Sequence, residues 1–321
     1  MTSSSVEIAF ARKTQPNSSK YLSDHGIQTI DTAEIYLGSE ELLGAASAVS
    51  LGFTIDTKVG HGAGGSTTPA TKENVIRSGE ASLNRLKTNQ VDVYYIHGFD
   101  QRVPLKDTLE GINELYKKGV FKRFGLSNFS VAEIEDVVRI SKERGFVLPT
   151  VYEGNYNAIN HLIEKKLFST IRKYNMVFHA YSPIAGGLLA KTPHQIKEGG
   201  QGRWDINTFV GKLYYGMYNK PNVMEFLEKF GKIATTKTKC SQAELAYRWI
   251  AYHSRLKGEL GDKIIGARYG PQLTEVLDAL GRGPLSAEVV EEVNGLWDLV
   301  KDDPPAEHRT ILEELKRSDI K

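Results

Sequence analysis

Four side chains of this sequence have the types and the spacing expected of an active site. They are Asp31, Tyr36, Lys58 and His97. Three of them end or directly follow short β-like runs, and Tyr36 stands in the loop behind the first run. In a parallel α/β barrel the carboxyl ends of the strands meet on one face, so these side chains are expected to lie together. Singly, each fits an ion pair, a core histidine or a packing tyrosine; their joint placement predicts a site.

The four residues have the chemistry needed to reduce a carbonyl group. A carbonyl that accepts a hydride develops negative charge on oxygen, so it needs a proton donor within hydrogen-bond reach. Tyr36 can donate, although a free tyrosine, with a pKa of about 10, is a reluctant acid near neutrality. The Lys58 ammonium would stabilise the phenolate, Asp31 would keep that ammonium charged, and His97 would orient the carbonyl oxygen. None of these groups stores a hydride, so a cofactor must supply it.

Short runs rich in β-branched and aromatic residues alternate with longer amphipathic segments, which is typical of βα units. The predicted strands are Gln28–Asp31, Phe53–Lys58, Val91–His97, Arg123–Ser127, Thr150–Glu153, Val177–Tyr181 and Lys263–Gly266, with an eighth near Val6–Phe10. The predicted helices are Thr71–Leu86, Leu105–Lys117, Val131–Arg144, Asn160–Tyr174, Asn222–Thr235 and Ser241–Ser254.

A series of eight βα units predicts an α/β fold of the (β/α)8 TIM-barrel type. The alternative is an open doubly wound sheet, but no G-x-G-x-x-G motif follows the first strand. The length of 321 residues suits one such barrel, so we expect a single domain over 1–321. Residues 191–220 break the alternation with glycines and aromatics in little periodicity, which predicts an irregular flap.

The composition argues against several kinds of partner. Lysine and arginine number 41 against 39 acidic residues, a net charge of +2 without a basic stripe, so neither nucleic acid nor an anionic membrane is expected. Cys240 is the only cysteine, and the histidines lack paired metal spacing, so no disulfide and no catalytic metal are predicted. No apolar stretch is long enough for a bilayer, and Glu7 interrupts the apolar start, so a cytoplasmic location is expected.

Blocks of sequence around these residues resemble the aldo-keto reductase superfamily in order from about Gly26 to Leu280. They are Ile30–Tyr36, Gly38–Gly44, Thr57–Lys58, Tyr95–His97, Gly125–Phe129, Pro149–Tyr152, Asn155–Ile159, Tyr181–Leu189 and Ile264–Ala267. Within the superfamily, Pro149–Ile159 is most similar to the aflatoxin aldehyde reductase branch. The resemblance implies the same barrel, NADPH as hydride donor, and a catalytic tetrad at the four residues named above. The branch resemblance is also compatible with a homodimer.

The resemblance further implies a set of cofactor and substrate contacts. Ser127 and Asn128 would bind the nicotinamide carboxamide, the loop after Tyr181 would follow the pyrophosphate, and Arg268 would grip the adenosine 2′-phosphate. The full cofactor set is Asp31, Ser127, Asn128, Glu153, Tyr181, Ser182, Pro183, Gly186, Leu188, Lys191, Gly266, Arg268, Gln272 and Glu275. The substrate set is Tyr36, His97 and, in the flap, Arg203.

Two features depart from the family pattern. No glycine occurs in Lys13–Lys20, where the family has a glycine-containing turn after its first strand, so that strand is expected to be atypical or shortened. Glu153 stands where the family commonly has glutamine. A carboxylate accepts from the carboxamide NH2 but cannot donate to its oxygen, so weaker or altered cofactor binding is expected.

These observations predict an NADPH-dependent reductase of aldehydes or reactive ketones, with Tyr36 as general acid. Two other functions stay open: an NADPH-binding regulatory subunit on the same fold, like the barrel subunits of potassium channels, and a catalytically impaired barrel. Flap aromatics and Phe99 favour a planar or apolar small-molecule carbonyl, whereas Arg203 favours an acidic one.

Overall fold

The computed structural model describes residues 5–9, 22–24, 26–36, 38–61, 66–200, 202–258, 262–265 and 270–318 of the chain. The chain divides into two compact units. The first consists of Met1–Gly154, Leu167–His179 and Gly258–Leu273, and the second of Asn155–Lys166, Ala180–Lys257 and Thr274–Lys321. The loop at 13–20, where the family glycine is missing, lies outside the described residues.

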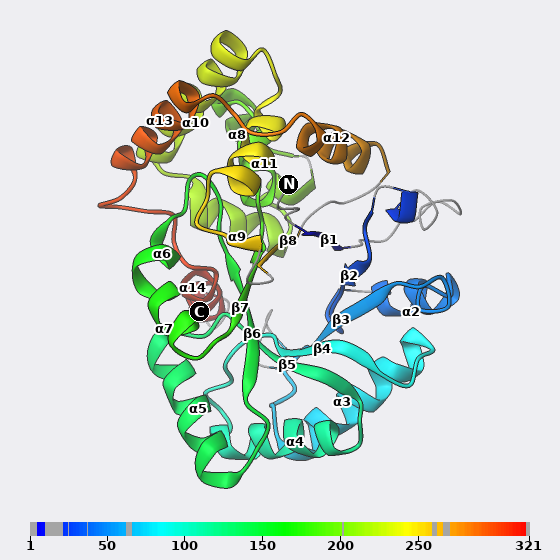
Figure 1. The fold of residues 1–321 in the computed structure, drawn as a ribbon. Coiled ribbons are helices and arrows are strands. Elements are labelled where there is room, and N and C mark those ends of the chain that lie inside the picture. Colours follow the sequence, from blue (N-terminus) through cyan, green and yellow to red (C-terminus); the bar gives the residue numbers. More distant parts are fainter. Residues whose placement is uncertain are drawn as a thin grey trace. The chain divides into compact units, whose positions relative to one another are not determined.

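The described strands follow one another in chain order around a closed barrel (Figure 1). They are β1 Ser5–Ala9, β2 Thr29–Asp31, β3 Thr54–Val59, β4 Val91–Ile96, β5 Phe121–Ser127, β6 Pro149–Asn155, β7 Val177–Tyr181 and β8 Lys263–Ile265. β1 pairs in parallel with both β2 and β8, with Ile8 opposite Ile30 and Glu7 opposite Ile265. The predicted (β/α)8 barrel is therefore confirmed, and its first strand is present over five residues.

The strands are buried almost without interruption, as expected where both faces of a parallel sheet are covered. Five of the six residues of β3 are buried, and so are five of the six residues of β4. Val93, Tyr95 and Val151 form a buried cluster contributed by β4 and β6. Polar side chains that lie among these strands therefore need partners inside the barrel.

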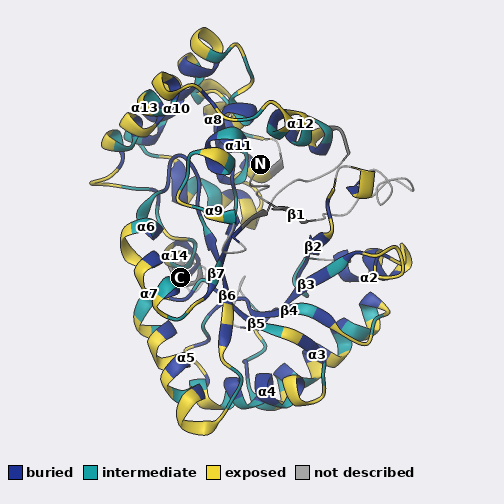
Figure 2. Ribbon diagram, in the orientation of Figure 1, coloured by how far each residue is buried: buried dark blue, intermediate teal, exposed yellow. Residues whose placement is uncertain are grey.

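The helices of the first unit lie outside its strands (Figure 1). They are α2 Ser39–Ala45, α3 Lys72–Leu86, α4 Leu105–Lys117, α5 Val131–Arg144 and α7 Phe168–Lys173. Thr71 caps α3 by accepting from the Asn74 backbone N–H, and Ser130 with Glu133 forms a capping box on α5. α5 ends at Gly145, which has a φ of 64°. Figure 2 shows the burial of the faces that α3 and α4 turn inward.

The helices of the second unit include those of the segment predicted to be an irregular flap. The elements are α6 Leu162–Lys166, η1 Ala185–Ala190, α8 Pro193–Glu198, η2 Gly202–Trp204, α9 Phe209–Tyr218, α10 Pro221–Ile233, η3 Ala234–Thr238, α11 Gln242–Tyr252, α13 Ala287–Gly295, η5 Leu296–Leu299 and α14 His308–Ser318. The helix α12, Gly270–Gly281, has residues in both units. Residues 191–220 therefore contain α8, η2 and α9 and are more regular than predicted. Trp204 anchors them, because its buried ring packs against Tyr214 and Tyr215.

One predicted helix is divided in the structure, and the lengths of the described helices bear on whether the chain could cross a membrane. The helix predicted over Asn160–Tyr174 is two helices, α6 and α7, separated at Leu167. The longest helix among the described residues is α3, with 15 residues and an amphipathic pattern. No helix in the described part of the chain is both long enough and apolar enough to cross a membrane.

Candidate functional site

Lys58 and Asp31 form a buried ion pair at the carboxyl ends of neighbouring strands. Lys58 lies on β3 and Asp31 ends β2, and both side chains are buried. The Lys58 ammonium donates to both carboxylate oxygens of Asp31, at 2.5 Å to Oδ2, and to the Thr32 carbonyl oxygen at 3.0 Å. Three acceptors thus meet the three N–H bonds of one ammonium, which fixes its position.

A second buried carboxylate contacts the same ammonium. Glu153 lies on β6, and its Oε2 atom is 3.1 Å from Lys58 Nζ. Burial alone would lower the pKa of the Lys58 ammonium, but the negative charges of Asp31 and Glu153 outweigh it and hold that pKa above its ordinary value. Lys58 is therefore charged throughout the neutral range. The family resemblance predicted Glu153 as a cofactor contact, and the ion pair with Lys58 was not predicted.

Tyr36 and His97 lie beside this ion pair. Lys58 Nζ is 5.5 Å from the centroid of the partly buried Tyr36 ring. The Tyr36 and His97 rings meet edge to face, with centroids 5.7 Å apart and an interplanar angle of 83°. Because Tyr36 touches both groups, the structure brings all four predicted tetrad residues together within the first unit.

A buried tyrosine–histidine pair adjoins the tetrad, and the sequence did not single it out. Tyr95 on β4 and His179 on β7 are fully buried, and the Tyr95 hydroxyl is 2.8 Å from His179 Nδ1. Lys58 Nζ lies 5.2 Å from the centroid of the Tyr95 ring. Gly125 leaves room for that ring, since a Cβ there would come within 2.3 Å of Tyr95 Cδ1. In the sequence, the signal for this pair was the occurrence of Tyr95 and His179, two side chains with polar atoms, inside strands that were predicted to be buried.

Ser127 and Asn128 place polar groups at the end of β5. Asn128 adopts a left-handed backbone conformation with a φ of 59°, and its Nδ2 donates to the His97 carbonyl oxygen at 2.9 Å and to Ser127 Oγ at 3.0 Å. Ser127 Oγ accepts there, so its own proton can be donated elsewhere. A hydroxyl, an amide and the Glu153 carboxylate, all from the first unit, form a donor and acceptor set suited to a carboxamide such as that of nicotinamide.

The loop after β7, in the second unit, has several residues in the left-handed region of backbone conformation. Ser182, Ala185, Gly186 and Gly187 all have positive φ values, and the Asn157 side chain fixes the loop by donating to the Ser182 carbonyl oxygen at 2.9 Å. Gly186 lies under the Tyr214 ring, which a Cβ would approach to 1.7 Å. Of the predicted contacts here, Pro183 and Leu188 are buried, and Tyr181, Ser182, Gly186 and Lys191 are partly buried.

The remaining predicted contacts are less informative. Gly266 and Arg268 lie outside the described residues, and Gln272 and Glu275 are exposed on α12. Arg203 is exposed on η2, and its Nη1 donates to the Tyr214 hydroxyl at 2.9 Å.

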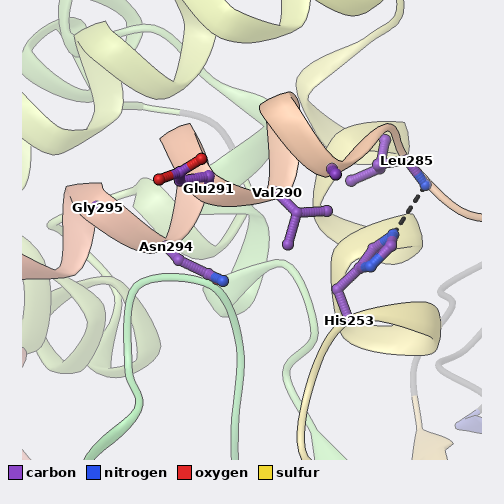
Figure 3. Close-up of a pocket in the computed structure, with 7 residues that line it drawn as sticks. His253, Leu285, Val290, Glu291, Asn294 and Gly295 are labelled. Atoms are coloured by element: carbon purple, nitrogen blue, oxygen red, sulfur yellow. Dashed lines mark hydrogen bonds between the residues drawn. The ribbon is translucent and has the colours of Figure 1, made fainter.

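A pocket elsewhere in the second unit contains none of the predicted site residues (Figure 3). Its lining consists of His253, Leu285, Ala287, Val290, Glu291, Asn294 and Gly295. His253 Nε2 accepts from the Leu285 backbone N–H at 2.8 Å, and Asn294 accepts from the Trp249 indole at 2.8 Å. These polar groups tie α11 to α13 rather than converge on an open space.

Comparison with known proteins identifies the class. The Aldo/keto reductase family model matches residues 5–298, so the chain belongs to the aldo/keto reductase family of oxidoreductases. It is 38% identical over 288 residues to "Oxidoreductase sirO" of Leptosphaeria maculans, covering 89% of this chain and 86% of that protein. It is also similar to two Homo sapiens proteins: "Aldo-keto reductase family 7 member A3", at 35% over 88% of both chains, and "Aflatoxin B1 aldehyde reductase member 2", at 34% over 88% of this chain and 81% of the other.

Proposed function

We propose that this oxidoreductase reduces the carbonyl group of an aldehyde or reactive ketone with NADPH and that Tyr36 is its general acid. The observation that carries the proposal is the position of the charged Lys58 ammonium, 5.5 Å from the Tyr36 ring, while that ring also meets His97. A phenol needs such a cation to become an effective acid near neutral pH.

The chain's own residues would move and hold the proton. Tyr36 donates its hydroxyl proton to the carbonyl oxygen as negative charge develops there, and the Lys58 ammonium stabilises the resulting phenolate. His97 orients the carbonyl oxygen by a hydrogen bond, and Asp31 keeps the Lys58 ammonium in place. The bound dinucleotide would supply the hydride.

The cofactor and substrate class follow from the groups present. Ser127, Asn128 and Glu153 suit a nicotinamide carboxamide, and the positive-φ loop at 182–187 suits a pyrophosphate. The choice of NADPH over NADH rests on the family resemblance. Phe99, two residues after His97, meets the Phe129 ring edge to face at 5.8 Å, and these apolar rings favour a planar or apolar substrate. A single catalytic domain over 1–321, a cytoplasmic location and a homodimer stay predictions.

The decisive test is Tyr36→Phe, which removes the proton donor and keeps the ring. Decay of NADPH absorbance with an activated aromatic aldehyde should fall by 10²-fold or more, on the order expected for loss of a general acid, whereas NADPH binding by fluorescence should persist. Tyr116→Phe is the matched control, because Tyr116 is an exposed tyrosine on α4 and its loss should leave turnover unchanged.

Three results would contradict the proposal in different ways. Unchanged turnover in Tyr36→Phe would remove Tyr36 as the acid. NADPH binding by the unmodified protein, with no turnover of any aldehyde, would favour the regulatory subunit. Neither binding nor turnover would indicate an impaired barrel.

A further inference from the structure

The contact of the Glu153 carboxylate with the Lys58 ammonium has no role in the proposed proton transfer. Asp31 and the Thr32 carbonyl oxygen already take the N–H bonds of Lys58, yet Glu153 also lies 3.1 Å from Nζ. The contact with Glu153 therefore adds negative charge rather than a necessary hydrogen bond. Glutamine, with nearly the same shape, would fill the same space without that charge.

We propose that Glu153 is a second, ionised counter-ion of Lys58 and that it keeps the proton on Tyr36 up to a higher pH than a neutral glutamine would. In this role Glu153 acts on the titration of Tyr36 by its charge, from its place beside Lys58. The proposal rests on the proposed function only for its consequence in catalysis, because the titration of Tyr36 can be measured without turnover.

The charges around Tyr36 support this assignment. Lys58 is the cation next to the ring, and Asp31 balances its charge, so a second carboxylate makes the cluster net negative. Tyr95, which pairs with His179, lies next to Lys58, and His97 lies next to Tyr36. Two residues before Lys58 on β3, the buried Asp56 accepts from the Val93 backbone N–H. Arg123 on β5 pairs with Asp92, with Nη2 and Oδ2 2.6 Å apart, and also interacts electrostatically with Asp56.

The expected effect follows from Coulomb's law. Glu153 Oε2 lies 3.1 Å from Lys58 Nζ, which lies 5.5 Å from the centroid of the Tyr36 ring, so the carboxylate oxygen and that centroid are at most about 9 Å apart. At an effective dielectric constant of about 20, a unit charge at such a distance moves a pKa by about one to two units. Lys58 favours the phenolate of Tyr36, whereas the Glu153 charge opposes it. Replacing Glu153 by glutamine should therefore lower the pH at which Tyr36 ionises by about one to two units.

This difference has a direction in catalysis. Reduction requires the phenol form of Tyr36, whose proton would pass from Oη to the carbonyl oxygen, while a bound reduced nicotinamide would supply the hydride. Oxidation of the alcohol requires the phenolate, which takes the proton back. Glu153 therefore extends reduction towards alkaline pH and moves oxidation to still higher pH.

The first experiment is an ultraviolet titration of tyrosinate in the full-length protein without substrate. Subtraction of Tyr36→Phe from each parent isolates the Tyr36 signal. Glu153→Gln should titrate about one to two pH units below wild type, whereas Glu153→Asp, which keeps the charge, should stay close to wild type. Asp92→Asn, which removes a carboxylate at the far end of β4, is the matched control and should leave the Tyr36 midpoint unchanged. Equal midpoints in wild type and Glu153→Gln would overturn the proposal.

A second measurement does not depend on the folding of any Glu153 variant. In wild type the Glu153 charge should limit the lowering of the Tyr36 midpoint by Lys58 to less than about one pH unit below the ordinary tyrosine pKa of about 10. A wild-type midpoint about two or more units below that value would show that Glu153 does not oppose Lys58 and would overturn the proposal. In turnover, the alkaline limb of kcat for reduction should shift with the titration midpoint, while KM for the aldehyde changes little. Absent turnover would refute the proposed function, and the titration would still decide the role of Glu153.

Discussion

Removing the Lys58 charge should destabilise the protein in a pH-dependent way. Lys58→Met keeps the length of the side chain but leaves Asp31 and Glu153 buried with no cation between them. Breaking a buried ion pair by removing one partner typically costs about 3–5 kcal/mol, because the charge left behind is uncompensated. Here two carboxylates are left, so at least one of them should take up a proton in the folded protein.

The sign of the pH dependence distinguishes this account from a simple loss of packing. In wild type, the raised pKa of Lys58 means that its contribution is present through the neutral range and is lost only as pH rises through the folded-state value. In the variant, the folded state holds a proton that the unfolded chain releases above a pH of about 4. Its stability should therefore fall as pH rises, by about 1.4 kcal/mol per pH unit for one extra proton.

Urea unfolding at pH 5, 6, 7 and 8, followed by circular dichroism, measures this directly. The loss of stability in Lys58→Met relative to wild type should grow by about 2–4 kcal/mol between pH 5 and pH 8. Lys72→Met is the matched control, because Lys72 pairs with Glu110 on the surface and its loss should show no such growth. A loss of equal size at every pH would show that no buried carboxyl takes up a proton, and the reasoning would fail.

Two further predictions concern the second unit. Burial, with a smaller effect of Arg203, lowers the pKa of His308 to about 4, so its neutral form is favoured and its contribution is lost as pH falls from about 6.5 towards 4. Wild type should lose about 1–2 kcal/mol more than His308→Gln between pH 7 and pH 5 in urea unfolding, and parallel losses would contradict this. Gly186→Ala should destabilise by about 2–4 kcal/mol, because its φ is 66° and the new Cβ would meet the Tyr214 ring. Tyr214→Ala should recover part of that loss in a double-mutant cycle, and strict additivity would show that the two residues do not clash.

Local signals in the sequence predicted the elements with clear ends. Leu105–Lys117 and Val131–Arg144 are helices with the predicted bounds, the second because the Ser130 cap and Gly145 mark both of its ends. The strand at Val177–Tyr181 also has its predicted bounds. The segment Asn160–Tyr174 is helical over most of its length but is divided into α6 and α7 at Leu167, whose φ of −120° departs from that of a regular helix. Periodicity does not reveal a break of a single residue. The helices within residues 191–220 were not predicted, because this segment has little helical periodicity in its apolar residues. Its packing depends instead on contacts of Trp204 with Tyr214 and Tyr215.

The candidate site divides in the same way. Strand ends located Asp31, Lys58 and His97, because side-chain positions along neighbouring parallel strands follow from the sequence alone. The contact between Lys58 and Glu153 did not follow, since β3 and β6 are not neighbours in the sheet and their inward side chains meet only through closure of the barrel. The pairing of Tyr95 with His179 joins β4 and β7 and was missed for the same reason.

The buried charges are better explained by chemistry than by stability. Replacing a buried ion pair with well-packed apolar side chains is often neutral or stabilising, so Lys58 and its two carboxylates are not needed to hold the barrel together. Such groups are found where a pKa must be set for a reaction. Asp31 would by itself favour the charged form of Lys58, so the Glu153 charge is not required for that purpose. We therefore expect the Glu153 charge to act on the titration of the phenol that lies next to Lys58, which is that of Tyr36.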